Sequence, residues 1–131
     1  MKNVLSLKAP VLQIATVDKG EYIGYGASYK SAKKMKIAIV SIGYADGLPR
    51  SLAGRGRIFF NSQEIRLVGR LSMDNIMCDV TDIENLNEGD FVDILNDQYT
   101  VDDMGQDAGT IGYEILNGIC KSGRFNIIEK K

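Results

Sequence analysis

Short runs of β-branched and aromatic residues, separated by clusters of glycine, asparagine and aspartate, dominate this chain. Val, Ile and Phe pack well on a pleated, half-buried surface, whereas Gly, Asn and Asp favour turns. Many short strands with turn signals between them are typical of a small antiparallel β-barrel or sandwich. The predicted strands are Val11–Val17, Met35–Ile42, Arg57–Phe60, Glu64–Val68, Ile76–Val80, Asp90–Leu95 and Gln98–Val101.

Two tight hairpin turns are expected between these strands. One is predicted at Asn61–Gln63 and the other at Asn96–Asp97. Asn and Asp accept the positive φ angles that short hairpin turns require, so both positions favour a sharp reversal of the chain. The sequence therefore predicts two hairpins in the β-rich part of the fold.

A helical pattern follows in the last third of the chain. A short helix is predicted over Val101–Asp107, where two aspartates would lie near the positive end of the helix dipole. A second helix is expected to take its N-cap oxygen from Thr110 or Asp107. The predicted fold is therefore mainly β, with one or two short helices near the C-terminus. The buried side of the second helix is predicted at Ile111, Ile115, Leu116 and Ile119.

Length and composition predict a single β domain over residues 1–131. One hydrophobic core can stabilise a chain of this size, and 44% hydrophobic with 25% charged residues is ordinary for a globular domain. The 16 basic and 17 acidic residues provide no positive field, so neither nucleic acid nor a membrane surface is an expected partner. No apolar run approaches the ~20 residues that cross a bilayer and no signal-peptide pattern is present, which predicts a cytoplasmic location.

Cysteine and histidine usage limits the possible chemistry. Cys78 and Cys120 are expected to be buried thiols, and with no histidine in the chain a metal site is not expected. Because histidine is the commonest general base, any proton transfer must use another group, such as tyrosine, lysine or a carboxylate.

Three of the six tyrosines stand beside glycine in apolar stretches, namely Tyr25, Tyr44 and Tyr113. A single tyrosine at a strand end usually packs against the core with its hydroxyl in water. Glycine lets the backbone approach a ligand or another chain closely, so three such pairs together indicate a functional surface. The Asp46-Gly47 pair that follows Tyr44 is first a turn signal, and Asp46 is expected to cap that turn.

Four motifs in this order resemble the C-terminal β domain of the pyridoxal-phosphate (PLP) dependent alanine racemases. A single match would be weak, but four in sequence, spread from about Leu5 to Ile119, make another family improbable. The motifs are Ile23-Gly24-Tyr25-Gly26-Ala27-Ser28-Tyr29, Ile42-Gly43-Tyr44-Ala45-Asp46-Gly47, Val68-Gly69-Arg70-Leu71-Ser72-Met73-Asp74 and Ala108-Gly109-Thr110-Ile111-Gly112-Tyr113-Glu114.

The resemblance implies an isomerase that interconverts L- and D-alanine for peptidoglycan synthesis. Family members pair a PLP-binding (β/α)₈ barrel with this β domain and act as head-to-tail homodimers. The lysine that binds PLP lies on the barrel, which is absent from these 131 residues. We therefore expect PLP in the full-length enzyme but neither PLP binding nor activity in the isolated domain. Whether Met1 is the native start stays open.

The resemblance also assigns roles to the tyrosines. Tyr25 corresponds to the second catalytic base, which faces the substrate Cα from the side opposite the PLP lysine, in the partner subunit's site. Racemisation removes a proton from one face of a planar carbanion and returns one to the other face, which explains the need for two bases. Tyr113 corresponds to the tyrosine that hydrogen-bonds the PLP phosphate.

Further site residues follow from the same motifs. Met73 corresponds to the position whose backbone N–H contacts the substrate carboxylate, and Asp74 is the acidic residue beside it. Tyr44 corresponds to a residue that lines the narrow substrate entrance. Arg50 and Arg70 correspond to charged positions further out along that corridor, although a surface arginine is an equally ordinary interpretation of each.

Two departures from the family pattern leave alternatives open. Gly112 stands where the family commonly has asparagine, so substrate preference could differ there, and residues 121–125 lack the usual Arg-Val-Pro-Arg run. The serine racemase domain of vancomycin-resistance proteins shares these motifs. A non-catalytic dimerisation module, in which the tyrosines only pack, is the alternative from a different class.

Overall fold

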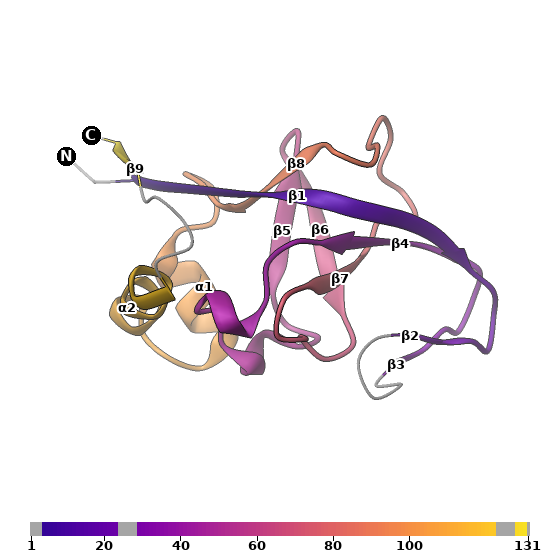
Figure 1. The fold of residues 1–131 in the computed structure, drawn as a ribbon, viewed down its shortest axis with the longest axis horizontal. Helices are drawn as coiled ribbons and strands as arrows, with labels where there is room; N and C mark the ends of the chain where they lie inside the picture. Colours follow the sequence, from indigo (N-terminus) through magenta and orange to yellow (C-terminus); the bar gives the residue numbers. More distant parts are fainter. Residues whose placement is uncertain (1–3, 24–28, 123–127, 131) are drawn as a thin grey trace.

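A closed antiparallel barrel is the centre of the computed structural model, which describes residues 4–23, 29–122 and 128–130 (Figure 1). Around the barrel the strand order is β4, β7, β6, β5, β8 and β1, and β1 pairs with β4 again, which closes the ring. The mainly β fold predicted from the sequence is confirmed. The barrel strands are β1 (Val4–Val17), β4 (Met35–Val40), β5 (Arg57–Phe60), β6 (Gln63–Val68), β7 (Ile76–Asp79) and β8 (Phe91–Leu95).

The long strand β1 closes the barrel because it pairs with different strands along its length. Its residues 11–17 pair with β4 and its residues 7–10 with β8, with a register shift just after Val11. Its first residues pair with β9 (Ile128–Lys130), so segments near both ends of the chain lie side by side. The sequence pattern predicted only the second half of β1, since Lys8 and Pro10 interrupt the apolar run.

The predicted hairpin at Asn61–Gln63 is confirmed between β5 and β6. Phe60 pairs with Gln63, which leaves Asn61 and Ser62 as the turn residues, with φ angles of 48° and 65°. Both angles lie in the left-handed region that a two-residue type I′ turn needs. The turn matches the right-handed twist of the strands, so β5 and β6 continue into the barrel without splaying.

The second predicted hairpin, at Asn96–Asp97, is wrong. The Asn96 side chain accepts hydrogen bonds from the backbone N–H groups of Gln98 and Tyr99, at 2.9 and 2.8 Å. This turn leads the chain out of β8 and into helix α1 (Val101–Ala108), so residues 98–100 form no strand. Tyr99 still packs in the hydrophobic core, which explains why the sequence there resembles a strand.

The predicted helix over Val101–Asp107 is confirmed as α1. Thr100 is its N-cap: the Thr100 hydroxyl accepts from the Asp103 N–H at 3.3 Å, and the Asp103 carboxylate accepts from the Thr100 N–H at 2.9 Å. This reciprocal pair satisfies two backbone donors that the helix leaves free. Asp102 and Asp103 both lie in the first turn, where the helix dipole favours negative charge.

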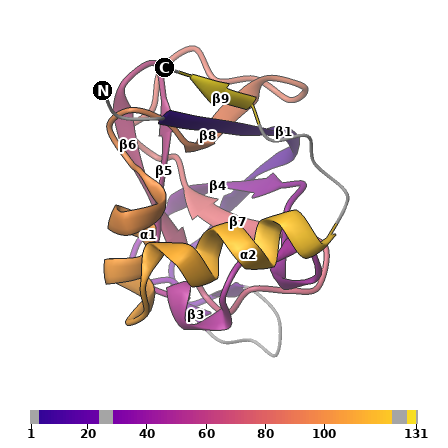
Figure 2. The ribbon, with the colours of Figure 1, turned by 90° about the vertical axis from the view of Figure 1, so that its left-hand side faces the viewer.

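The second predicted helix is confirmed as α2 (Gly112–Ser122), but its buried side differs from the prediction at two positions, one of which is Leu116, which is only half-buried. Ile115 and Ile119 are buried in the core, whereas Ile111 precedes the helix and is exposed. Figure 2 shows α1 and α2 lying together at one end of the barrel.

Neither predicted N-cap of α2 is found. Helix α2 begins at Gly112, so Ile111 is the residue directly before it, and the Thr110 hydroxyl donates to the Glu114 carboxylate at 2.5 Å. The Asp107 carboxylate belongs to α1, where it accepts hydrogen bonds from Arg57 and Tyr99. The sequence pattern could not show that the Asp107 side chain interacts with Arg57 and Tyr99 instead of capping α2.

The two cysteines lie in different environments. Cys78 is fully buried in the core, as predicted, and burial raises the pKa of its thiol. Cys120 is exposed on α2, so its predicted burial is wrong. The neighbouring Ile119 faces the core, and consecutive helical residues point about 100° apart.

Short elements lie outside the barrel strands. The strands β2 (Tyr22–Ile23) and β3 (Tyr29–Lys30) pair at the end of the molecule away from the two helices (Figure 1). The 3-10 turns η2 (Tyr44–Asp46) and η3 (Arg50–Leu52) connect β4 to β5. Across the described ranges, no helix has the length and apolar character needed to span a membrane.

Candidate functional site

Arg50 stacks on Tyr44 beside the barrel. The guanidinium carbon lies 4.0 Å from the centroid of the phenol ring, within the range of a cation–π contact. Together with Arg70 and Leu71, these two side chains line a pocket of about 340 Å³. The structure therefore brings three of the predicted site residues, Tyr44, Arg50 and Arg70, to one cavity.

A buried carboxylate fixes the turn that carries Tyr44. Asp46 is only 3% exposed, and its Oδ2 accepts a hydrogen bond from the Gly43 N–H at 2.9 Å. Gly47 ends the turn with a φ of 103°, a conformation that residues with a Cβ rarely adopt. The Asp-Gly pair thus acts as the predicted turn cap, and it holds the Tyr44 backbone in place.

The loop that carries Met73 and Asp74 lies against η2. The Tyr44 N–H donates to the Ser72 carbonyl at 3.1 Å, and the Ala45 N–H donates to the Met73 carbonyl at 3.0 Å. The Met73 side chain is 54% exposed and Asp74 is exposed as well. Both predicted substrate-binding residues are therefore held next to Tyr44 and open to a ligand or a second domain.

Tyr113 lies in the first turn of α2 and is 72% exposed. Helix α2 touches η2 where Gly118 meets Gly47, so Tyr113 and Tyr44 are carried by elements in direct contact. A phenol this exposed can donate a hydrogen bond to a phosphate.

The space beside Gly112 is occupied by another side chain. A Cβ at Gly112 would overlap the Asp102 carboxylate, which comes from the first turn of α1. The asparagine that is common in the family would therefore require Asp102 to rotate away. The Asp102 carboxylate of α1 therefore lies against Gly112, the residue that precedes Tyr113.

Tyr25 lies outside the described residues, so its role stays a prediction, as does the departure over residues 123–125. The strands on either side of Tyr25 are paired, with Ile23 opposite Tyr29. Tyr29, Gly69 and Arg70 contribute to a second hollow of about 220 Å³. Arg70 therefore borders both the Tyr44 pocket and the strand that follows the Tyr25 motif.

Sequence reasoning missed Leu71 and Tyr29 as cavity residues. Both belong to motifs that were singled out, but an apolar leucine or a lone tyrosine is usually a core residue. Their motif membership was the only signal that could have identified them.

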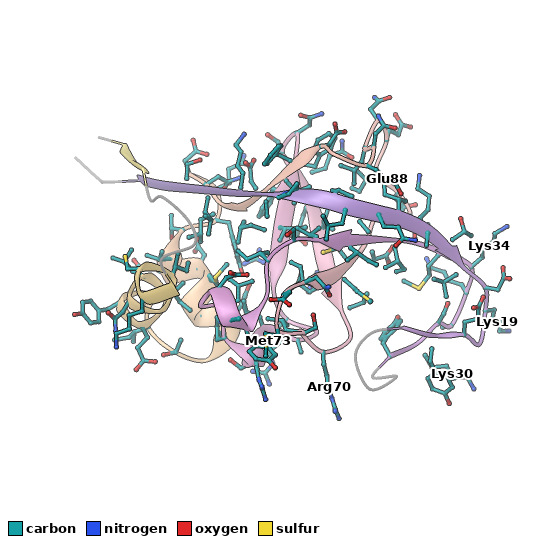
Figure 3. The ribbon with its side chains drawn as sticks, in the orientation of Figure 1. Lys19, Lys30, Lys34, Arg70, Met73 and Glu88 are labelled. Carbon is teal, nitrogen blue, oxygen red and sulfur yellow. The ribbon has the colours of Figure 1, made fainter. Side chains whose placement is uncertain are left out.

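The charge of the pocket suits a small anion or zwitterion. Arg50 and Arg70 both line it, and guanidinium groups form strong charge-assisted hydrogen bonds with carboxylates. Figure 3 shows Arg70 and Met73 on the same side of the molecule. Within the described ranges, no group of three or more histidine, cysteine, aspartate or glutamate residues could hold a metal ion.

Comparison with known protein families gives a match over nearly the whole chain. The family described as "Alanine racemase, C-terminal domain" matches residues 4–126. A catabolic alanine racemase of Agrobacterium fabrum is 39% identical over 131 residues, covering 98% of this chain and 34% of the relative. An alanine racemase of Acidiphilium cryptum is 40% identical over 119 residues, covering 91% of this chain and 33% of the relative.

Solved structures agree with the sequence matches. The alanine racemase of Bartonella henselae, with covalently bound pyridoxal phosphate, superposes with a TM-score of 0.84 at 36% identity, over 87% of this chain and 32% of that one. The biosynthetic alanine racemase of Pseudomonas aeruginosa gives 0.82 at 34% identity, over 87% and 32%. This chain spans about a third of the length of these relatives.

Proposed function

Because this chain belongs to the alanine racemase C-terminal domain family, we propose that it is the β domain of a PLP-dependent alanine racemase that makes D-alanine for peptidoglycan. The pocket that joins Tyr44, Arg50 and Arg70 carries the proposal, since Tyr44 and Arg70 come from two separate motifs of one family. Alanine is favoured over serine because the relatives compared above are alanine racemases.

The cofactor is proposed to bind between this domain and a barrel outside these 131 residues. The exposure of Tyr113 supports this division, since its hydroxyl is free to reach a phosphate presented by another domain. Bound PLP supplies an electron sink for the negative charge that develops at the substrate Cα. Tyr113 contributes orientation, by hydrogen bonding the phosphate.

Tyr25 is proposed to hold and release a proton at the substrate Cα, on the face opposite the PLP lysine. The ordinary pKa of tyrosine is ~10, so positive charge or hydrogen bonding must stabilise the phenolate for Tyr25 to act as a base near neutral pH. With no histidine in the chain, this help is expected from the barrel.

The remaining predicted residues are proposed to bind and admit the substrate. The Met73 backbone N–H binds the substrate carboxylate, and Asp74 lies beside it. Tyr44 narrows the entrance, while Arg50 and Arg70 attract the carboxylate along the corridor. The contacts between η2 and the Met73 loop support this arrangement, because they hold Tyr44, at the proposed entrance, next to Met73, which is proposed to contact the substrate carboxylate.

The working enzyme is proposed to be a head-to-tail homodimer in the cytoplasm, in which this domain completes the partner's site. Two large apolar side chains, Met73 and Tyr113, are exposed on segments that contact η2. Exposed apolar groups at one site often mark a surface that another domain covers.

The decisive experiment compares the full-length protein with two tyrosine variants. We expect the wild type to racemise alanine, and Tyr25→Phe to lose turnover by about a hundredfold or more in both directions, as loss of a general base predicts. Tyr22→Phe is the matched control, since Tyr22 is an exposed tyrosine three residues before Tyr25 in the sequence. Equal activity of Tyr25→Phe and Tyr22→Phe would favour a non-catalytic dimerisation module.

The isolated 131-residue chain provides a second test. We expect it to retain no PLP after gel filtration and to leave L-alanine unchanged. Turnover by this chain alone would contradict the proposed division of the site between two domains.

A further inference from the structure

Gly47 and Gly118 form a backbone contact between η2 and helix α2. A Cβ at Gly47 would overlap the Gly118 carbonyl and would lie 2.5 Å from the Ile119 nitrogen. A Cβ at Gly118 would lie 3.0 Å from the Gly47 oxygen, which is closer than ordinary van der Waals contact. The two elements therefore approach so closely that a side chain on either glycine has to push them apart.

The opposite side of η2 is held just as closely. A Cβ at Gly43 would overlap the carbonyl oxygens of Ser72 and Met73. The same carbonyls accept the Tyr44 and Ala45 N–H groups, at 3.1 and 3.0 Å. The turn η2 is thus packed between α2 and the Met73 loop, and both contacts are made by backbone atoms.

Backbone contacts transmit a displacement because no side-chain rotamer can absorb it. The three elements in contact carry Met73, Tyr44 and Tyr113, each proposed above to act on the substrate or the cofactor. Asp46 and Ile119, next to the contacting glycines, are both buried, so neither element can easily move outward. A change in the spacing between η2 and α2 must therefore change the position of Tyr44 relative to Tyr113.

We propose that Gly47 and Gly118 are positioning residues that set the distance between the substrate entrance at Tyr44 and the cofactor contact at Tyr113. This inference rests on the proposed function, since it assumes that both tyrosines act on bound molecules. It predicts that a single change at the glycine contact alters substrate affinity and PLP affinity together.

The test is Gly118→Ala in the full-length protein. Alanine is a stronger helix former than glycine, so α2 is not weakened, but the added methyl group forces the Gly47 oxygen to move by a few tenths of an ångström. Misplacement of 1 Å can cost about a hundredfold, so we expect a rise of about three- to tenfold in KM for alanine and in the dissociation constant of PLP. The PLP constant is measured by fluorescence titration, without turnover.

Asn117→Ala is the matched control. Asn117 is exposed on the same helix, so its replacement changes helix propensity without touching η2. We expect its KM and PLP affinity to equal those of the wild type, and its melting temperature to be at least that of the wild type. A merely structural role for Gly118 predicts lower melting temperature with unchanged affinities, and that result overturns the inference.

A Tyr113→Phe background shows whether the effect acts through the Tyr113 hydroxyl. There we expect Gly118→Ala to leave PLP affinity unchanged, because the hydrogen bond that it misplaces is already lost. If the wild type racemises alanine but Gly118→Ala binds PLP and alanine normally, the positioning role is wrong and the proposed function stands. If the wild type racemises no alanine, the proposed function itself fails.

Discussion

The phenol oxygen of Tyr99 lies 2.6 Å from Oδ2 of Asp107, to which it donates a hydrogen bond. Asp107 Oδ2 also accepts a hydrogen bond from Arg57 Nε at 3.0 Å, and the Arg57 guanidinium lies 4.9 Å from the centre of the Tyr99 ring. Arg57 belongs to β5 and Asp107 to α1. The three side chains therefore tie the helical end of the domain to the barrel wall.

Replacing Tyr99 by phenylalanine tests how much the Tyr99–Asp107 hydrogen bond contributes to stability. We expect Tyr99→Phe to lower the free energy of unfolding by about 1–2 kcal/mol, because the hydrogen bond to a charged, partly buried acceptor is lost. Urea denaturation of the domain measures the change. Tyr22→Phe, at an exposed tyrosine, should change the same quantity by less than about 0.5 kcal/mol. Equal losses in the two variants would mean that the Asp107 bond contributes nothing.

Stability should also depend on alkaline pH. Burial, reinforced by the hydrogen bond to Asp107, raises the pKa of Tyr99 above its ordinary value of 10.0. The folded state then holds the phenol proton more tightly than the unfolded state. This contribution is complete below pH 10.0 and is lost as the pH rises from there through the folded-state pKa.

We therefore expect the free energy of unfolding to fall as the pH rises above about 10, and to fall less steeply in Tyr99→Phe. Denaturation curves collected between roughly pH 8 and pH 11 measure both slopes. Identical slopes in wild type and variant would show that Tyr99 titrates as it does in the unfolded chain.

The two cysteines should differ in reactivity. Cys120 is exposed on α2, whereas Cys78 is fully buried and its thiol pKa is raised by that burial. Because the thiolate is the reactive form, we expect a thiol reagent to modify Cys120 in the folded domain and Cys78 only after denaturation. Cys120→Ser is the control, and it should abolish the fast reaction. A fast reaction that persists in this variant would contradict the burial of Cys78.

The stacking of Arg50 on Tyr44 should affect how readily the substrate enters the pocket. Arg50→Lys keeps the positive charge but replaces the planar guanidinium, so the contact with the Tyr44 ring is weakened. A cation–π contact at an exposed site contributes about 0.5–1 kcal/mol, so we expect KM for alanine to rise about two- to fivefold with little change in kcat. Arg55→Lys, an exposed arginine outside the residues named for this pocket, should leave both constants unchanged. A loss of kcat without a change in KM would argue against an entrance role.

Hydrophobic patterning predicted most of the barrel because each strand carries its own β-branched or aromatic run. Strand β5 has the predicted bounds, and the turn at Asn61 follows from the conformational tolerance of that residue. The pattern failed where a single side chain redirects the backbone. At Asn96, side-chain hydrogen bonds turn the chain into a helix, although the apolar residues that follow resemble a strand.

For the candidate site, the motifs identified residues but not their contacts. The stacking of Arg50 on Tyr44 depends on how two consecutive 3-10 turns are oriented, and residue spacing does not determine that orientation. The sequence also could not predict that the Asp102 side chain fills the space beside Gly112, because the two residues come from different helices. Tertiary packing, rather than local propensity, sets both relationships.

Strand β1 has a consequence for how the domain acquires its structure. Its partners lie at residues 35–40, 91–95 and 128–130, so the barrel cannot close until the chain has been synthesised well past its middle. Pairings between residues so distant in sequence slow folding, because a large loop must be ordered before the contacts form. During translation, residues 7–10 of β1 therefore stay unpaired until residues 91–95 have been synthesised, and a chaperone that shields them should raise the yield of folded domain.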